Sequence, residues 1–530
     1  MNPFAVLASA SIGRPVAFQT SGYNAATNGR RMMNVASSTR GVSSLALADG
    51  PMLTARARKA VMDNPMASIA VTAFVAEVIG TGIRPHFRHA DLVKRRALER
   101  EFALWSVQAS ATRRLGADGK PDSLQDFWGL QQLVCRNVIE AGEAFSRNRY
   151  RVAGDLSPTG LRVPLQLDLI EPEQLAFWRN SGDMASPQNI IRAGIEFNQI
   201  HERVAYHFYR EHPGDSSIWP NAFEVVRVPS GDVLHVMEFI RGNQIRGITS
   251  LAPILSAMAD LDEFSDATRY RQKLGAYLFA WKKTLTPDNS NLDLSGTAGN
   301  DVAAPGSAYT EMAPGQLNVL DANADEDFGF YAHPGVENTY EAFQRIEGRM
   351  LATAQRISYD MLTGDMTDVN YSSARIRLMA LRRVWTQYQK SVIVHQFCRP
   401  VLRSWLDAAA LAGVIDARDY RKNPEEYLAV EWLAQPWDWV DPVKDTTATL
   451  MKIGACLTSR SAVVKATGAD VEEVDQQIAE DHAREASLGL QPVYGASRTT
   501  ETDSPGGNPD EGKPAAEPDE SFPVKVKTKK

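Results

Sequence analysis

The sequence predicts an α+β protein in which long helices organise the rest of the chain. Apolar residues recur at three- and four-residue steps between Val336 and Met361 and again beyond Ala374, which is the spacing of one helix face. Several short segments between Ala144 and Glu238 instead alternate polar and apolar residues, as strands do. At 530 residues and 44% hydrophobic composition, the chain can bury a substantial core and form more than one domain.

The composition argues against several function classes. The formal charge of −7 disfavours a generally basic, sequence-reading nucleic-acid binder, although a ring or channel could still surround DNA without gripping it. Cys135, Cys398 and Cys456 are far apart, with no C-x-x-C motif or histidine cluster nearby, which disfavours a disulfide scaffold or a zinc site. The most apolar stretch, Ile69 to Gly80, is too short for a membrane helix.

The first 54 residues are expected to form an extended arm. No acidic residue precedes Asp49, and Arg14, Arg30, Arg31 and Arg40 lie among Ser, Ala and Asn. Organelle transit peptides share this composition, so a transit peptide is an alternative interpretation.

Residues 55–250 are expected to be a mixed region of helices and short strands. The first helix is expected to end at Gly80-Thr-Gly82, because glycine readily adopts the left-handed conformation that terminates helices. Turn sequences such as His212-Pro-Gly-Asp215 separate the strand candidates. The expected helices span 56–80, 91–109 and 123–144, and the expected strands lie within 144–170, 190–197, 203–209, 223–228 and 233–238.

Two further helices bracket a polar excursion. The first is expected to start at Ser250, a capping residue followed by Pro253 in the first turn, and to reach about Lys282. Residues 284–335 then shift in composition to Asn, Asp, Gly, Pro and Ala. The second helix is expected from Val336 to Met361, and its apolar face requires a partner.

A short polar loop leads into the longest helix, which is expected over residues 374–412 with a bend at Pro400. Its expected apolar positions are Leu378, Leu381, Trp385, Tyr388 and Val392, and a separate basic stripe consists of Arg375, Arg382, Arg383 and Lys390. No acidic residue occurs between Asp368 and Asp407. Such a helix either belongs to a core with a solvated charged side, or packs beside another copy while offering charge to a polyanion.

The C-terminal part combines an aromatic patch, helices and a polar tail. Trp432, Trp437 and Trp439 are expected to form local core. Residues 444–485 are predicted to be helical with a break at Gly468. The stretch from about Ser497 is rich in Pro, Gly and charge, which predicts disorder.

Motifs for catalysis and nucleotide binding are absent. Each Gly-Lys pair in the chain is followed by Pro, so there is no phosphate-binding loop, and neither H-E-x-x-H nor G-x-S-x-G occurs. We therefore expect no enzymatic activity, no cofactor and no metal. Asp365 and Asp368 nevertheless have a spacing that a metal site could use, which leaves a metal-dependent hydrolase as an alternative.

Five collinear groups of residues carry a resemblance to a known family. They are Val78-Ile-Gly-Thr-Gly82; Leu234 to Gly247 followed by Ser250-Leu-Ala-Pro253; Ile357 to Leu362 followed by Asn370 to Arg375; Trp437 to Lys444; and Leu457 to Ser461 followed by Gly468 to Glu473. In this order they resemble the portal proteins of lambda-type tailed bacteriophages, over about Ala55 to Pro492. Residues 284–335 carry no such match.

The resemblance implies a portal-like α+β subunit that assembles as a ring, usually of twelve copies, around a DNA channel at one capsid vertex. Double-stranded DNA passes through such a ring without sequence-specific contacts, and the implied protein partners are the terminase large subunit, the major capsid protein and a head-tail connector or adaptor. The implied location is the virion, with assembly in the cytoplasm of the bacterial host and no membrane partner. Another oligomeric head-tail connector or a capsid scaffold is the alternative.

The resemblance also divides the chain into regions. They are an extended arm (1–54), an α+β wing (55–250), stem helix 1 (251–282), an inserted clip (283–335), stem helix 2 (336–360), a tunnel loop (361–373), a long helix with a return to the wing (374–443), an α-helical crown (444–496) and a disordered tail (497–530).

Two sets of residues are predicted to act in such a ring. The set expected to face the lumen as a polar collar is Asp365, Thr367, Asp368, Asn370 and Tyr371. The set expected at subunit interfaces is Arg269, Arg271, Glu337, Glu341, Arg375, Arg382, Arg383 and Lys390. For the basic stripe, acids of a neighbouring subunit are favoured over DNA as the partner. A passage for a polyanion should avoid sticky contacts, because each phosphate that Lys or Arg neutralises adds affinity.

Overall fold

The computed structural model describes residues 40–115, 121–151, 161–180, 189–215, 223–277, 280–284, 326–330, 337–367, 369–437, 442–468 and 471–490. The chain divides into two units, Met1–Gly468 and Ala469–Lys530. In the second unit the described element is one helix, α15 (Val471–Leu488). None of the described helices is long and apolar enough to cross a bilayer.

Helices α1 (Val42–Asp63) and α2 (Pro65–Val78) open the described chain. The expected extended arm is therefore wrong for residues 42–54, and the single helix expected over 56–80 is broken at Asn64. The Asn64 side chain accepts hydrogen bonds from the backbone N–H groups of Met66, at 2.9 Å, and Ala67, at 3.1 Å. Because Pro65 has no N–H to donate and Asn64 caps the next helix, the chain starts a new helix here.

Gly80 and Gly82 end α2 as predicted, with φ of +54° and +110°. A Cβ atom on Gly82 would lie 2.8 Å from the Cβ of Trp128, so the turn is closed by packing as well as by backbone conformation. Helices α3 (Leu92–Ser106) and α4 (Phe127–Ala141) confirm the next two predicted helices.

The main core lies among α2, α3, α4 and the long helix. The ring of Phe102 has its centroid 5.7 Å from that of Phe127 and 5.1 Å from that of Trp405, and Phe127 stacks on Phe397 at 5.7 Å. Strand β1 (Arg84–Phe87) pairs antiparallel with β13 (Val430–Leu433), which returns the C-terminal part of the chain to this core.

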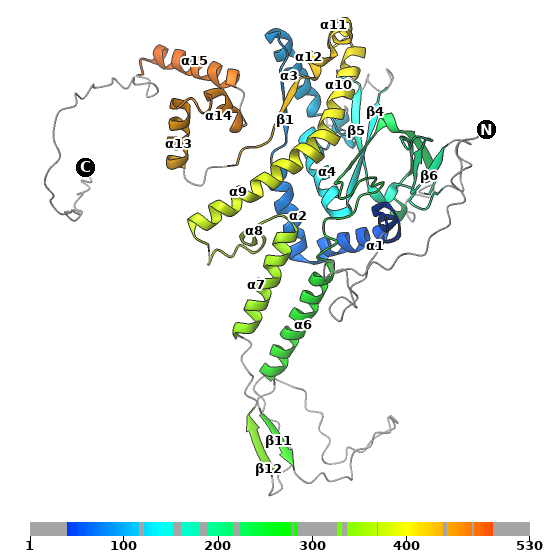
Figure 1. Ribbon diagram of the computed structural model, residues 1–530, viewed down its shortest axis with the longest axis vertical. Coiled ribbons are helices and arrows are strands. Elements are labelled where there is room, and N and C mark those ends of the chain that lie inside the picture. Colours follow the sequence, from blue (N-terminus) through cyan, green and yellow to red (C-terminus); the bar gives the residue numbers. More distant parts are fainter. Residues whose placement is uncertain are drawn as a thin grey trace, which may run out of the picture. The chain divides into compact units, whose positions relative to one another are not determined.

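Two antiparallel sheets complete the α+β region (Figure 1). One has the order β10-β4-β5 and the other the order β6-β7-β8-β9. Their strands are β4 (Glu143–Tyr150), β5 (Leu165–Ile170), β6 (Ile190–Arg192), β7 (Ile195–Phe197), β8 (Arg203–Tyr209), β9 (Val225–Pro229) and β10 (Val233–Met237). A separate hairpin joins β2 (Arg113–Leu115) to β3 (Pro121–Ser123). The predicted strands are confirmed, except that 190–197 is a hairpin, because Ala193 and Gly194 both have positive φ and make a tight turn.

A buried ion cluster fixes the segment that enters the next helix. The Glu143 carboxylate accepts hydrogen bonds from Arg246 Nε at 2.6 Å and from Gly247 N at 2.8 Å, and lies 3.0 Å from His235 Nε2. Burial acts to raise the pKa of Glu143, but Arg246 and His235 outweigh it and lower the pKa to about 2. Burial lowers the pKa of His235 to about 4. The cluster therefore ties β4 and β10 to residues 246–247.

Helix α6 (Leu255–Tyr277) is shorter than the helix predicted from Ser250 to about Lys282. Ser250 does not cap it, because its hydroxyl donates to the Ile139 carbonyl at 3.2 Å. The predicted C-terminal end of this helix, at about Lys282, is wrong as well. Residues 280–284 instead form strand β11 (Ala280–Thr284), which pairs antiparallel with β12 (Glu326–Phe330). Helix α7 (Glu337–Ala354) follows, so two helices do bracket an excursion of which the structure describes these two strands.

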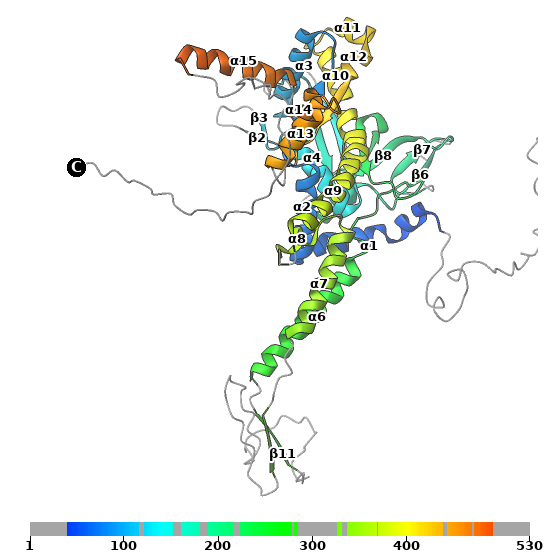
Figure 2. The same cartoon turned by 60° about the vertical axis from the view of Figure 1, so that its left-hand side comes forward.

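Helices α6 and α7 run antiparallel and side by side (Figures 1 and 2). The Phe264 ring on α6 lies 4.8 Å from Phe343 and 5.9 Å from Tyr340 on α7. At the other end of the pair, Gln355 Nε2 donates to the Ser250 carbonyl at 3.0 Å. Residues before α6 thus meet the end of α7, while the middle of α6 meets the start of α7, which establishes the antiparallel direction.

The helix predicted to reach Met361 ends at Ala354. Arg356 has φ of +59°, and the Ile357 N–H donates to the Ala352 carbonyl at 3.0 Å, which closes the helix with a left-handed residue. A short helix, α8 (Tyr359–Thr363), follows.

The long helix comprises α9 (Tyr371–Tyr388), a π-helical segment (Gln389–Cys398) and α10 (Arg399–Leu411). Its predicted apolar side is confirmed: Trp385, Tyr388 and Val392 are buried, and Leu378 and Leu381 pack against the core. Pro400, where a bend was predicted, is the second residue after the π-helical segment and cannot donate a hydrogen bond to the preceding turn.

The rest of the first unit contains α11 (Ala417–Lys422), α12 (Pro424–Leu428), α13 (Pro442–Gly454) and α14 (Arg460–Ala466). Trp432 and Trp437 pack against the main core, as predicted, and Trp439 lies outside the described residues. The predicted helical character of 444–485 is confirmed, with an additional break between α13 and α14. The tail from residue 497 and the arm up to residue 39 lie outside the described residues.

Candidate functional site

The strongest concentration of predicted site residues lies where α7, α8 and α9 meet. We call α8, the loop 364–370 and the adjoining ends of α7 and α9 the junction. Gly364, with φ of +73°, ends α8 and starts the loop. Asn370 ends the loop, because its side-chain oxygen accepts a hydrogen bond from the Ser373 N–H at 2.8 Å and so caps α9.

Asp365 is the best-defined acidic side chain of the loop. Its Oδ1 accepts hydrogen bonds from the backbone N–H of Thr367, at 3.1 Å, and from the Thr367 hydroxyl, and its Oδ2 lies 3.6 Å from the Arg345 guanidinium. The Thr367 hydrogen bonds, supported by Arg345, lower the pKa of Asp365. The carboxylate is therefore ionised at neutral pH and already has partners, which weakens the alternative that it ligates a metal.

The structure brings together only part of the predicted collar. Asp365 and Thr367 are in contact, while Thr367 and Asn370 are exposed to solvent. Asp368 lies outside the described residues, and for Tyr371 the structure describes the backbone, which begins α9.

An ion pair that the sequence patterns did not reveal closes the junction. Arg377 of α9 donates to Asp360 of α8, and Ser358 Oγ donates to the same carboxylate at 3.0 Å. Arg349 lies over the Tyr359 ring, 5.6 Å from its centroid. Ser358, Tyr359 and Arg377 help to line a hollow of about 400 Å³ between α7, α8 and α9. The sequence separation of Asp360 and Arg377 does not predict this ion pair, because the conformation of the loop between them decides whether the two side chains meet.

Three of the four interface candidates on α6 and α7, Arg269, Arg271 and Glu341, are exposed in the single chain. Arg269 is exposed and pairs with Asp266 at 3.2 Å, and Arg271 is exposed. Glu341 pairs with Arg345 one turn later at 3.0 Å. The backbone of Glu337 starts α7, and its side chain lies outside the described part of the structure.

The basic stripe of α9 divides into two pairs according to its contacts within the chain. Arg375 donates to Asp445 of its own chain, and Arg382 lies over the Trp437 ring, 5.6 Å from its centroid. Arg383 and Lys390 are exposed. The first pair thus has partners within the chain, which sequence separation concealed.

Two exposed apolar faces lie beside these charges. On α7 the face consists of Ile346, 57% exposed, and Met350, 54% exposed, and on α9 it consists of Ile376, 70% exposed, and Met379, 51% exposed. The periodic apolar pattern of the sequence includes the α7 face. The pattern did not reveal the α9 face, because Ile376 and Met379 do not lie on the buried side of the long helix. Side chains of this size gain free energy from burial against a partner.

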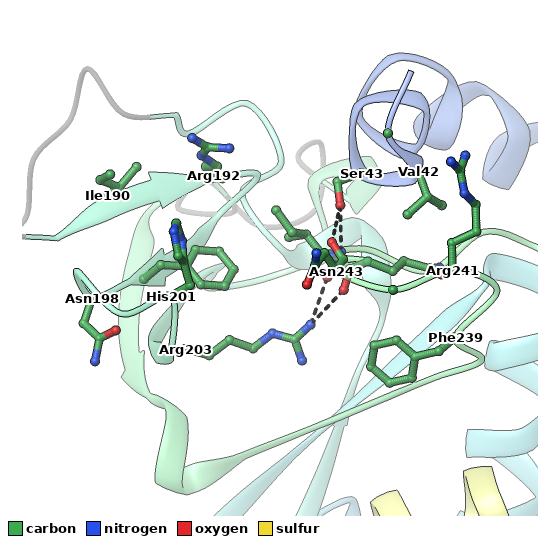
Figure 3. Close-up of a pocket in the computed structure, with 15 residues that line it drawn as sticks. Val42, Ser43, Ile190, Arg192, Asn198, His201, Arg203, Phe239, Arg241 and Asn243 are labelled. Carbon is green, nitrogen blue, oxygen red and sulfur yellow. Dashed lines mark hydrogen bonds between the residues drawn. The ribbon is translucent and has the colours of Figure 1, made fainter. Parts of the chain in front are cut away.

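A larger hollow, of about 730 Å³, lies between the start of α1 and the loops of the four-stranded sheet (Figure 3). Its basic side chains hold the backbone: Arg203 donates to the carbonyls of Gln244 and Ile245, both at 3.4 Å. Ser43 Oγ donates to the Asn243 carbonyl at 2.7 Å (Figure 3). The arrangement holds α1 against the loop before α6, and its lining residues include no pairing of a nucleophile with a base.

One group of described residues has donor atoms close enough for a metal ion, namely Glu171, Glu173 and His212. Arg58 Nε donates to Glu173 at 2.5 Å, and His212 Nε2 lies 3.3 Å from Glu171. The guanidinium therefore already neutralises the carboxylate that a cation would need.

Comparison with protein families gives one match over most of the chain. A family model described as "Phage portal protein, lambda family" matches residues 28–389. The chain is 26% identical over 413 residues to a probable portal protein of Halomonas phage phiHAP-1, covering 77% of this chain and 74% of that protein. It is 22% identical over 357 residues to the portal protein of Escherichia phage N15, covering 63% of this chain and 66% of that protein. With portal protein B of Escherichia phage lambda the identity is 21% over 365 residues, covering 64% and 66%.

Solved structures that match this chain include the neck of a native GTA particle, at 14% identity and a TM-score of 0.43, covering 85% of this chain and 99% of that one. An HK97 family phage portal protein from Corynebacterium diphtheriae matches at 11% identity and a TM-score of 0.28, covering 64% and 86%.

Proposed function

The chain belongs to the lambda family of phage portal proteins, and we propose that it is the subunit of a ring at one capsid vertex through which DNA is packaged and ejected. The observation that carries the proposal is the family match over residues 28–389, which spans α1 to the middle of the long helix. The proposed region boundaries follow the elements: a wing built on α1 to β10, a stem of α6 and α7, and a clip that contains β11 and β12.

The ring is proposed to form through unlike faces of adjacent copies. Rotational symmetry with more than two subunits makes every contact heterologous, so one side of the chain must complement the other. The exposed Ile346 and Met350 on α7, and Ile376 and Met379 on α9, suit the apolar centre of such a contact. Exposed charges on α6, such as Arg269 and Arg271, suit its rim.

The loop 364–370 is proposed to border the channel. A passage for DNA works best without strong phosphate contacts, because each one adds affinity that must be broken during movement. Asp365 carries a negative charge beside Arg345, and Thr367 and Asn370 present neutral polar groups. This chemistry provides hydration without a net positive charge on the loop.

The proposed partners follow from the position at the vertex. They are double-stranded DNA without sequence preference, the terminase large subunit during packaging, the major capsid protein around the ring, and a head-tail connector or adaptor after packaging. The proposed location is the virion, with assembly in the host cytoplasm.

The test is electron microscopy of the purified full-length chain, with particle mass measured in parallel. End-on class averages should show closed rings with an axial hole, and the masses should be a discrete multiple of 58.4 kDa. Closed particles without a hole would favour a capsid scaffold instead, and a chain that stays monomeric at high concentration would refute the proposal.

A further inference from the structure

A row of exposed basic side chains continues along the long helix beyond the stripe seen in the sequence. We call it the basic row, and it consists of Arg383, Lys390, His395, Arg399 and Arg403. It starts in α9, crosses the π-helical segment and ends in α10. The row spans about 20 residue steps, which corresponds to roughly 30 Å of helix.

The π-helical segment keeps the row on one face. Arg383 and Lys390 are about two turns of an α-helix apart. His395 follows Lys390 at i+5, a spacing that would drift around an α-helix but suits the wider turn of the π-helical residues 389–398. Arg399 and Arg403 then follow at i+4 steps. All the side chains of the row are exposed, which agrees with this alignment.

The four Arg and Lys charges of the row are not neutralised within the part of the chain that the structure describes. None of its side chains forms an ion pair with a described carboxylate. The first acid after the row is Asp407, one turn beyond Arg403, and its Oδ1 accepts a hydrogen bond from the Tyr420 hydroxyl at 2.8 Å. The row is therefore a concentration of positive charge in a chain whose formal charge is −7.

The exposed side of the long helix is apolar at its N-terminal end and basic further along. These two chemistries suit two different kinds of partner. The N-terminal end carries Ile376 and Met379, which suit a protein interface. Around the basic row the exposed neighbours include the polar Gln387 and Ser391. Nucleic-acid interfaces are polar and strongly positive, and Gln and Ser are common phosphate ligands beside Lys and Arg.

We propose that the basic row binds the phosphate backbone of double-stranded DNA, without reading its sequence. The inference rests on the proposed function, since it adds a second DNA-contacting surface to the same subunit. Strong phosphate contacts would slow DNA moving through the channel, so the row is assigned a role apart from the passage that the loop 364–370 is proposed to border; the loop precedes α9, whereas the row begins near the other end of that helix.

The test measures binding of a fluorescein-labelled duplex of about 30 base pairs and mixed sequence to assembled rings by anisotropy, across a range of salt concentrations; such a duplex is long enough to span the row. The double variant Lys390→Ala with Arg399→Ala removes two phosphate contacts per subunit. The control Arg421→Ala with Lys422→Ala removes the same charge from exposed positions on α11, off the row. Electron microscopy of each preparation verifies ring assembly.

The row variant should bind DNA about tenfold more weakly for each phosphate ligand removed near 0.1 M salt, and the slope of log affinity against log salt should become shallower by about two. The control should change neither. A charge-conserving variant, Lys390→Arg with Arg399→Lys, should retain binding and exclude a folding defect.

Unchanged DNA affinity in assembled rings of the row variant would overturn the inference. Failure of ring assembly with normal DNA binding by the dissociated subunits would also overturn it, because the row would then meet a neighbouring subunit's acids. If the unaltered chain forms no rings, the proposed function fails instead, and electron microscopy reveals that result independently of the anisotropy measurement.

Discussion

Replacing Ile346 and Met350 by alanine should weaken assembly of the ring while leaving the subunit folded. Both side chains are more than half exposed in the single chain, at 57% and 54%, so each truncation removes less than half of a fully buried side chain from the subunit and should cost about 1 kcal/mol of its stability. Full burial of such a side chain contributes about 1.5 to 3 kcal/mol. Since just over half of each side chain remains to be covered, the pair contributes about 2 kcal/mol to each subunit contact, or roughly a thirtyfold weaker association for the variant.

The assay is the fraction of assembled particles against protein concentration, measured by mass photometry, with a urea unfolding curve for each protein. A matched control is Val93→Ala with Leu411→Ala, because these side chains are also highly exposed but lie outside the proposed contact. The control should assemble as the unaltered chain does. If the α7 variant assembles with unchanged concentration dependence, the assignment of this face to the subunit contact is wrong.

Three further predictions concern other parts of the molecule. Stability should fall as the pH drops from about 6.5 to 4, because the pKa of His235 is lowered to about 4 in the folded chain. In this range the unfolded chain binds a proton that the folded chain does not. The fall continues below pH 4.5 through Glu143, whose pKa is lowered to about 2. Urea midpoints at several pH values should therefore depend less on pH in His235→Gln. Asn64→Ala should cost about 1 to 2 kcal/mol in unfolding free energy, because it removes the cap of α2 and two hydrogen bonds to Asp262 at 2.8 and 2.9 Å. Asp365→Ala should leave rings intact but slow DNA filling of capsids, because it removes the loop carboxylate beside Arg345.

Each of these predictions has an outcome that contradicts it. An equal pH dependence in His235→Gln and the unaltered chain would mean that the buried cluster does not titrate in this range. If Asn64→Ala leaves the unfolding free energy unchanged, Pro65 alone accounts for the break between α1 and α2. If capsids fill with DNA normally in the Asp365→Ala variant, and in the double variant that also carries Asp368→Ala, the loop does not border the DNA passage.

The local signals in the sequence predicted the elements that depend on local chemistry. Alternation of polar and apolar residues located β8, and the glycines at 80 and 82 located the end of α2. Asn64 and Pro65 carried a usable break signal that the apolar periodicity on both sides obscured.

Elements that depend on distant partners could not be predicted in this way. Residues 280–284 continue a helical pattern but pair with residues 326–330 as a strand. Residues 42–54 contain a single acid, Asp49, and have the composition of an arm, yet they are helical and Thr54 Oγ1 donates to the Ala141 carbonyl on α4 at 3.3 Å. Tertiary packing outweighs local composition in both segments.

For the candidate site, sequence patterns located the loop and the basic stripe but did not reveal which residues the side chains of the stripe contact. The contact of Arg375 with Asp445 joins residues far apart in the chain, so no spacing rule could reveal it. The π-helical segment was also invisible, because its residues are ordinary in helices and its effect is only to shift the phase of the exposed side chains. That shift is what extends the row to Arg399 and Arg403.

The most direct test of the proposed portal function is a cryo-electron-microscopy reconstruction of the assembled chain that locates residues 364–370. We predict a closed ring whose axial hole is bordered by this loop from every subunit, with α7 of each subunit against its neighbour. A ring whose hole is lined by other segments, with the loop buried between subunits or on the outer surface, would contradict this prediction.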